Sequence, residues 1–127
     1  MSQTKVLLVD DEFEFASALA ERLQMRNYIV DTASNGLEAM ALFHKSPPDV
    51  VILDLKIPGM NVIEILKSIK KFDPSIEVII LTGHGDIKSV EEGMKSGAFE
   101  YIMKPIDIGE LTTKIDNAME KKKKSLT

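Results

Sequence analysis

Short apolar runs alternate with longer amphipathic segments along the chain. The runs are KVLLV, YIVDTA, DVVILDL, IEVIILT and FEYIM. Three of them are continuous and rich in β-branched residues, which is typical of strands buried on both faces of a sheet. The run YIVDTA is more mixed in polarity, so we place it nearer a sheet edge.

Helix-start signals precede the amphipathic segments. A polar residue followed three positions later by Glu forms a capping-box pattern. The pattern occurs at Asn35, Asn61 and Asp107, and Asp11 offers a further copy. The apolar stripe after Asn61 comprises Val62, Ile65, Leu66, Ile69 and Phe72. Its helical spacing predicts an amphipathic helix.

The weakest predicted helix runs from Ile87 to Ser96, where the apolar stripe is thin and Gly97 supplies the stop. With few apolar anchors, it is expected to be the most mobile element. Strand and helix therefore alternate through the chain. This order predicts an α/β fold with a doubly wound, five-stranded parallel sheet and helices on both faces. A length of 127 residues suits one domain.

Composition and charge narrow the functional classes. The chain has no cysteine, which excludes disulfides, a thiolate nucleophile and Cys-ligated zinc. Net charge is −4, and removing the four positive charges of the lysines at 121–124 leaves −8. The acidic body argues against nucleic-acid binding. The lysine run is interpreted first as a solvated helix end, with contact to phosphates or anionic lipid as the alternative.

No apolar run approaches the length of a membrane span, and the start of the chain shows no signal-peptide pattern. We therefore expect a cytoplasmic protein with no membrane partner.

Candidate chemistry gathers where the predicted strands end. The first run ends at Asp10 and Asp11, the third at Asp54, the fourth at Thr82 and the fifth at Lys104. In open parallel sheets, ligands bind beyond the carboxyl ends of the strands. Three carboxylates, one hydroxyl and one ammonium are thus expected at one sheet edge.

Three carboxylates at one edge need a cation, because two of them about 4 Å apart repel by roughly 4 kcal/mol at an effective dielectric of 20. Lys104 offers only one charge. Oxygen ligands completed by water favour Mg²⁺ over Ca²⁺, and a set without His or Cys disfavours zinc.

Each residue also has a plainer reading: Asp11 can cap a helix, and Asp54 can simply pair with Lys104. Together, the residues indicate a phosphoryl site. Asp54 is the predicted nucleophile, Mg²⁺ and Lys104 neutralise developing charge, and Thr82 donates a hydrogen bond to a phosphoryl oxygen.

Four motifs in this order resemble the receiver domain of bacterial two-component response regulators. They are the acidic pair Asp10–Asp11, VILDLKIPGM around Asp54, LTGHGD with Thr82, and YIMKP with Lys104. The resemblance covers nearly the whole chain. It implies a flavodoxin-like strand order of 2-1-3-4-5. It also implies a receiver domain over residues 1–120, followed by a basic tail or linker start at 121–127.

The resemblance implies a mechanism. Asp54 would accept a phosphoryl group from a phosphohistidine on a sensor histidine kinase, or from a small phosphodonor. Asp11, Asp54 and the backbone carbonyl of Lys56 would hold Mg²⁺, with Asp10 acting through water. The protein would be a signalling phosphoacceptor with only self-directed phosphotransfer and autodephosphorylation chemistry.

The resemblance also implies a switch. Thr82 and Lys104 would contact the phosphoryl group, and the peptide before Pro105 matches one that is cis in the family. Tyr101 matches the switch aromatic, although such a ring at a sheet edge often only packs. Its inward turn would remodel the surface of the fourth helix, fifth strand and fifth helix. An output domain, a partner protein or a second copy would dock there.

Two features depart from the family or vary within it. Asn61–Val62 replaces the usual Asp-Gly or Asn-Gly after the PGM motif, so that turn differs or the helix begins at once. Lys56 and His84 occupy variable positions that flank the acyl phosphate. Our hypothesis is that they set the lifetime of the phosphorylated state, while a solvated loop position remains an equal reading for His84.

Three other classes of protein share part of this pattern. A phosphatase of the haloacid-dehalogenase type needs an acid two residues after its nucleophile, where this chain has Lys56. A flavin-binding protein needs a phosphate-cradling loop where this chain has DDEFEF. The remaining alternative is a receiver-like interaction module that is never phosphorylated. The intact set of Asp54, Thr82 and Lys104 argues against it.

Overall fold

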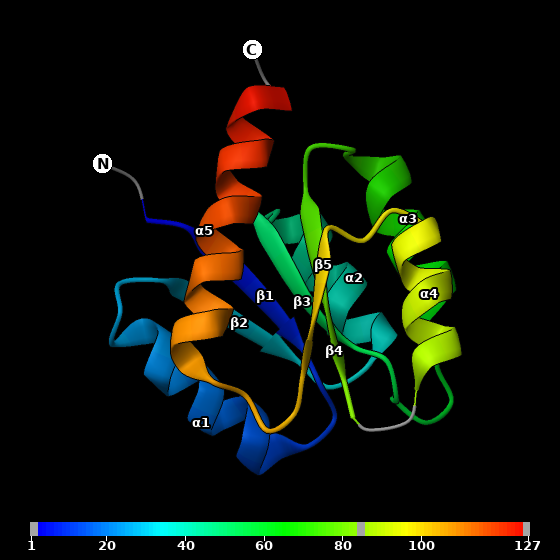
Figure 1. Ribbon diagram of the computed structural model, residues 1–127, viewed down its shortest axis with the longest axis horizontal. Helices are drawn as coiled ribbons and strands as arrows, with labels where there is room; N and C mark the ends of the chain where they lie inside the picture. The colour runs from blue at the N-terminus through cyan, green and yellow to red at the C-terminus, as the bar shows by residue number, and fades with distance from the viewer. Residues whose placement is uncertain (1–2, 84–85, 126–127) are drawn as a thin grey trace.

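The computed structural model describes residues 3–83 and 86–125 and shows five strands alternating with five helices (Figure 1). The elements are β1 (Lys5–Val9), α1 (Phe13–Gln24), β2 (Ile29–Ala33), α2 (Gly36–Lys45), β3 (Val50–Asp54), α3 (Val62–Phe72), β4 (Glu77–Thr82), α4 (Ile87–Lys95), β5 (Glu100–Met103) and α5 (Ile108–Ser125). All strand pairs are parallel, in the order β2-β1-β3-β4-β5. The predicted α/β fold and strand order are confirmed.

Helices cover both faces of the sheet, as expected for a doubly wound fold (Figure 1). On one face, α1 and α5 pack on the side chains of Val6, Leu8 and Ile52. On the other face, α2 and α3 pack on Leu7 and Leu53. All residues of β3 and β4 are buried, whereas β2 at the edge is partly exposed, as its mixed pattern predicts. The central strand ends are therefore fixed by packing on both sides.

Three of the four predicted N-caps are present. The side-chain oxygens of Asn35, Asn61 and Asp107 each accept a hydrogen bond from the backbone N–H three residues later. The fourth, at Asp11, is wrong. Helix α1 has Glu12 at its N-cap position, and the Glu12 side chain accepts no capping hydrogen bond. This difference changes which acid faces the sheet edge.

Helix α4 is the thinly anchored helix that the sequence predicts. Gly93 is its one buried residue, and Ile87 is 71% exposed. Gly97 follows the helix with φ of 113°, a backbone conformation that favours glycine, so it acts as the expected stop. A Cβ on Gly93 would lie 2.3 Å from the Ile80 Cδ1 atom, so α4 approaches β4 closely. The expected mobility of α4 stays a prediction.

Helix α5 continues through Ser125 and projects past the sheet at its upper end (Figure 1). Lys122 Nζ lies 2.9 Å from Asp49 Oδ1, and the Lys122 side chain is only 14% exposed. Lys121 Nζ lies 3.6 Å from an oxygen of the buried Glu77. The interpretation of the run as a solvated helix end therefore fails for Lys122. The domain boundary at residue 120 stays a prediction.

Within the described ranges, no helix is both long and apolar enough to span a membrane.

Candidate functional site

The carboxyl ends of four strands bring the predicted site residues to one edge of the sheet. Asp10 follows β1, where its N–H donates to the Ala33 carbonyl at 3.0 Å. Asp54 ends β3 and Thr82 ends β4. Asp10, Asp54 and Thr82 are all buried. Burying three polar side chains costs free energy unless they are hydrogen-bonded or paired with opposite charge.

Lys104 supplies the positive charge at this edge. Its Nζ lies 2.7 Å from Glu12 Oε1, 3.0 Å from Asp10 Oδ2 and 3.7 Å from Asp54 Oδ2. Burial lowers the pKa of Lys104, but its contacts with Glu12 and Asp10 and the negative charge of Asp54 outweigh the effect of burial, so the net direction is upward. Lys104 is therefore a fixed cation at the site.

Glu12, rather than Asp11, joins the acidic cluster. Carboxylate oxygens of Asp10, Glu12 and Asp54 all lie within 4.8 Å of one another. Asp11 is exposed. The sequence patterns did not point to Glu12 as a site residue. Its place two residues after Asp10 was the available signal. The metal contact expected of Asp11 has no counterpart in this arrangement and stays a prediction.

The cluster fits a hard divalent cation such as Mg²⁺. Asp10 Oδ2 is buried and accepts no hydrogen bond from the described part of the chain. Its contact with Lys104 Nζ, at 3.0 Å, is an ion pair. One ammonium among three carboxylates leaves a net negative charge, and carboxylate oxygens are the ligands that Mg²⁺ prefers. The contribution of the Lys56 carbonyl stays a prediction.

The Asp54 carboxylate is the electrostatically costly group of the cluster. Burial raises the pKa of Asp54 from its usual 3.8 to about 6, and the charges of Asp10 and Asp11 add to this. The Lys56 N–H, which donates to Asp54 Oδ1 at 3.1 Å, and the Lys104 charge act in the opposite direction. Any added positive charge near Asp54 would therefore stabilise its ionised form.

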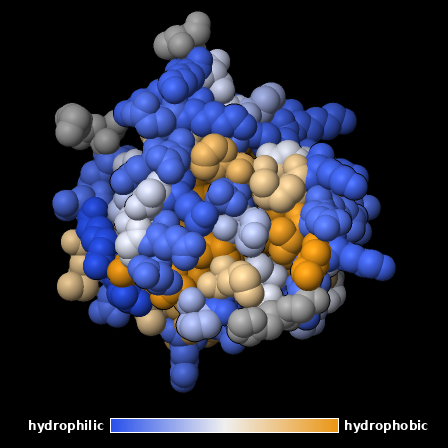
Figure 2. All heavy atoms as spheres, viewed as in Figure 1, coloured by the Kyte–Doolittle hydropathy of each residue, from blue (hydrophilic) through white to orange (hydrophobic). Residues whose placement is uncertain are grey.

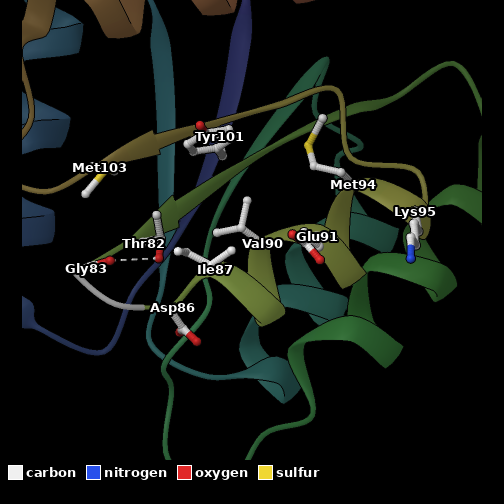
Figure 3. Close-up of a pocket in the computed structure, with 10 residues that line it drawn as sticks. All are labelled: Thr82, Gly83, Asp86, Ile87, Val90, Glu91, Met94, Lys95, Tyr101 and Met103. Carbon is white, nitrogen blue, oxygen red and sulfur yellow. Dashed lines mark hydrogen bonds between the residues drawn. The ribbon is translucent and has the colours of Figure 1, made fainter.

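Thr82 and Tyr101 line one hollow between β5 and α4. Its volume is about 500 Å³, and Val90, Met94 and Met103 also line it (Figure 3). The Thr82 hydroxyl donates to the Gly83 carbonyl at 3.1 Å. Tyr101 is 41% exposed. Figure 2 shows apolar side chains gathered in this part of the surface. Both predicted switch residues thus border the same hollow.

The remaining predictions concern the peptide before Pro105, the start of α3, and the positions of Lys56 and His84. The Lys104–Pro105 peptide is cis, as the resemblance implies. Helix α3 begins at once with Val62, so the departure at the preceding turn is accommodated. Lys56 Nζ lies 3.9 Å from Asp86 Oδ2, with its side chain 70% exposed. His84 lies outside the described residues.

Comparison with known proteins decides the family. The family description "Response regulator receiver domain" matches residues 6–116. The chain belongs to this family. It is 41% identical to the sporulation initiation phosphotransferase F of Bacillus subtilis over 111 residues, which cover 87% of this chain and 90% of that protein.

Solved receiver structures superpose closely. A response regulator receiver domain protein from Clostridium thermocellum gives a TM-score of 0.90 at 40% identity, covering 98% of this receiver and 99% of that chain. Other relatives are much longer. The receiver is 34% identical to the DNA-binding transcriptional regulator NtrC of Salmonella typhimurium but spans only 25% of its length. The same domain thus occurs in relatives with and without further domains.

Proposed function

We propose that this receiver domain accepts a phosphoryl group on Asp54 in a Mg²⁺-dependent two-component relay. The observation that supports this most directly is the position of Asp54. It is a buried carboxylate at a strand end, with Lys104 Nζ 3.7 Å away and two more carboxylates within 4.8 Å. The donor is the phosphohistidine of a sensor histidine kinase or a small phosphodonor. A cytoplasmic location follows as a further expectation.

The transfer forms one bond between an Asp54 oxygen and phosphorus. It breaks the P–N bond of the donor imidazole, whose electron pair returns to the nitrogen. Bound Mg²⁺ supplies positive charge that neutralises phosphoryl oxygens. Asp10, Glu12 and Asp54 would hold it, with Asp11 and the Lys56 carbonyl as the ligands that the family resemblance adds.

Lys104 and Thr82 receive the phosphoryl group. The Lys104 ammonium already faces Asp54 Oδ2 and exchanges a carboxylate partner for a phosphoryl oxygen. The Thr82 hydroxyl leaves the Gly83 carbonyl and donates to another phosphoryl oxygen. Water later hydrolyses the acyl phosphate. Lys56 and His84 are the proposed determinants of that rate.

The output is a change in the surface formed by α4, β5 and α5. Tyr101 and Thr82 border the hollow between α4 and β5, so movement of Thr82 opens space toward which the Tyr101 ring turns. Few buried contacts hold α4, which lowers the cost of repacking it. The remodelled surface binds an output domain, a partner protein or a second copy of the chain.

The test is covalent labelling. The protein is incubated with Mg²⁺ and acetyl phosphate, and intact mass is measured before and after mild base. We expect a base-labile mass increase of one phosphoryl group that is absent from Asp54→Asn. Asp49→Asn, at the opposite end of the sheet, is the matched control and retains labelling. Equal labelling of Asp54→Asn contradicts the proposal.

A further inference from the structure

We propose that Phe15 is a positioning residue for Lys104, holding the ammonium beside Asp54 through a cation–π contact. Lys104 Nζ lies over the Phe15 ring, 4.3 Å from its centroid. Cations within about 6 Å of a ring centroid are attracted to the negative face of the ring. The inference rests on the proposed function, because the role of Lys104 is to meet the phosphoryl group.

Packing against the protein core holds the Phe15 ring in place. It packs against the buried cluster that α1 and α5 form with the sheet, and it lines a groove with Leu19 and Ile106. Phe15 also lies three residues after Glu12, and both side chains contact Lys104 Nζ. Glu12 and Phe15 therefore approach Lys104 together. The neighbouring Phe13, by contrast, is 80% exposed and has no such contact in the described structure.

The ring differs chemically from the other partners of Lys104. Asp10, Glu12 and Asp54 are also the candidate metal cluster, so loading the site changes what they contact. A ring has no carboxylate to give up, and its attraction for the ammonium persists when the acidic partners change. A long lysine side chain loses rotamer freedom on ordering, and a contact that survives throughout reduces that loss.

The alternative role of Phe15 is packing alone. Leucine preserves the apolar character but removes the aromatic face, whereas tyrosine preserves the face. The variants are therefore Phe15→Leu, Phe15→Tyr and the control Phe13→Leu, with thermal unfolding to confirm that each is folded. The first measurement is the NMR shift of the Lys104 ε-methylene protons, which a ring current displaces. The second is the affinity for beryllofluoride, a phosphoryl mimic, in the presence of Mg²⁺.

We expect Phe15→Leu to lose the displaced Lys104 signal and to bind beryllofluoride about threefold to tenfold more weakly, given the usual strength of cation–π contacts. Phe15→Tyr and Phe13→Leu keep both properties. Wild-type affinity in Phe15→Leu, or equal weakening in Phe15→Tyr, overturns the inference. Failure of the wild-type protein to bind beryllofluoride overturns the proposed function instead, and the NMR shift then decides the contact separately.

Discussion

The Glu12 carboxylate lies closer to the Lys104 ammonium than either Asp10 or Asp54 does, with 2.7 Å between Oε1 and Nζ. Glu12 is nevertheless much more exposed than the two aspartates, with its side chain 64% accessible. It reaches the site from the first position before α1. The cluster is thus one solvent-exposed acid added to two buried ones, and the exposed acid loses less on exchanging its partner for water.

The first prediction concerns which acid binds the metal. Replacing Glu12 with Gln removes one carboxylate from the cluster. We expect Mg²⁺ affinity to fall about twofold to fivefold, in the range typical of exposed charge interactions. Calorimetric titration measures it, with Glu14→Gln as a control on the same helix. Asp11→Asn is titrated alongside. A loss in Asp11→Asn with no change in Glu12→Gln would support Asp11, and not Glu12, as the metal ligand.

The second prediction concerns the cost of burying Asp54. Since burial raises its pKa to about 6, the folded protein binds this proton more tightly than the unfolded chain, whose carboxyl titrates near 3.8. Above the folded pKa both forms are ionised, and the folded state bears the whole penalty. As the pH falls through 6 toward 4, the folded carboxyl takes up its proton and the penalty disappears.

Asp54→Asn removes this penalty. Without metal, we expect it to stabilise the protein at neutral pH by on the order of 2–3 kcal/mol, with the gain vanishing near pH 4. Urea unfolding at both pH values measures the difference. Adding Mg²⁺ stabilises the wild type more than the variant, because binding to the folded state adds to stability. A gain of equal size at both pH values would contradict the electrostatic explanation.

The third prediction concerns the buried Glu77 at the opposite end of the sheet. Lys70 Nζ lies 3.3 Å from Glu77 Oε1 and donates to the carbonyls of Pro74 and Ile76 at 2.8 Å each. Lys70→Met removes one of the positive charges that pair with the buried Glu77 carboxylate, so we expect a loss of about 1–3 kcal/mol in unfolding free energy. Lys71→Met, exposed on the same helix, is the control. Equal stability of the two variants would argue against this account.

The fourth prediction concerns the close approach of α4 to β4. In Gly93→Ala, the added Cβ would meet Ile80 Cδ1 at 2.3 Å, so we expect a loss of about 1–3 kcal/mol from overpacking. Ile80→Val removes the clashing methyl group. The double variant should therefore be more stable than Gly93→Ala alone, as chemical denaturation can measure. If the losses of the two single variants simply add in the double variant, the contact between the new Cβ and Ile80 Cδ1 is not what destabilises Gly93→Ala.

The fold could be predicted because the sequence signals were redundant. Continuous apolar runs marked β3 and β4, and the Asn35 and Asn61 caps marked the helices after β2 and β3. Parallel strands then required Asp54 and Thr82 to end at the same edge. Each of these conclusions depends on periodicity and topology, which survive small errors in element boundaries.

The place of Glu12 among the acids of the β1–α1 turn could not be predicted in this way. Three consecutive acids carry no periodic signal, so the backbone path decides which one faces inward. Here the Glu12 N–H donates to Asp10 Oδ1 at 2.9 Å, which shifts the start of α1 by one residue and leaves Asp11 in solvent. The contact of Lys122 with Asp49 could not be predicted from the sequence either, because it joins α5 to the far end of the sheet.

The central claim is that Asp54 becomes an acyl phosphate. Borohydride reduces an acyl phosphate to an alcohol, so an aspartyl phosphate leaves homoserine in the chain. The decisive measurement is peptide sequencing by mass spectrometry after treatment with Mg²⁺, acetyl phosphate and borohydride. We predict homoserine at position 54, dependent on both Mg²⁺ and the phosphodonor. Homoserine at another aspartate, or none at all in the folded wild-type protein, would contradict the claim.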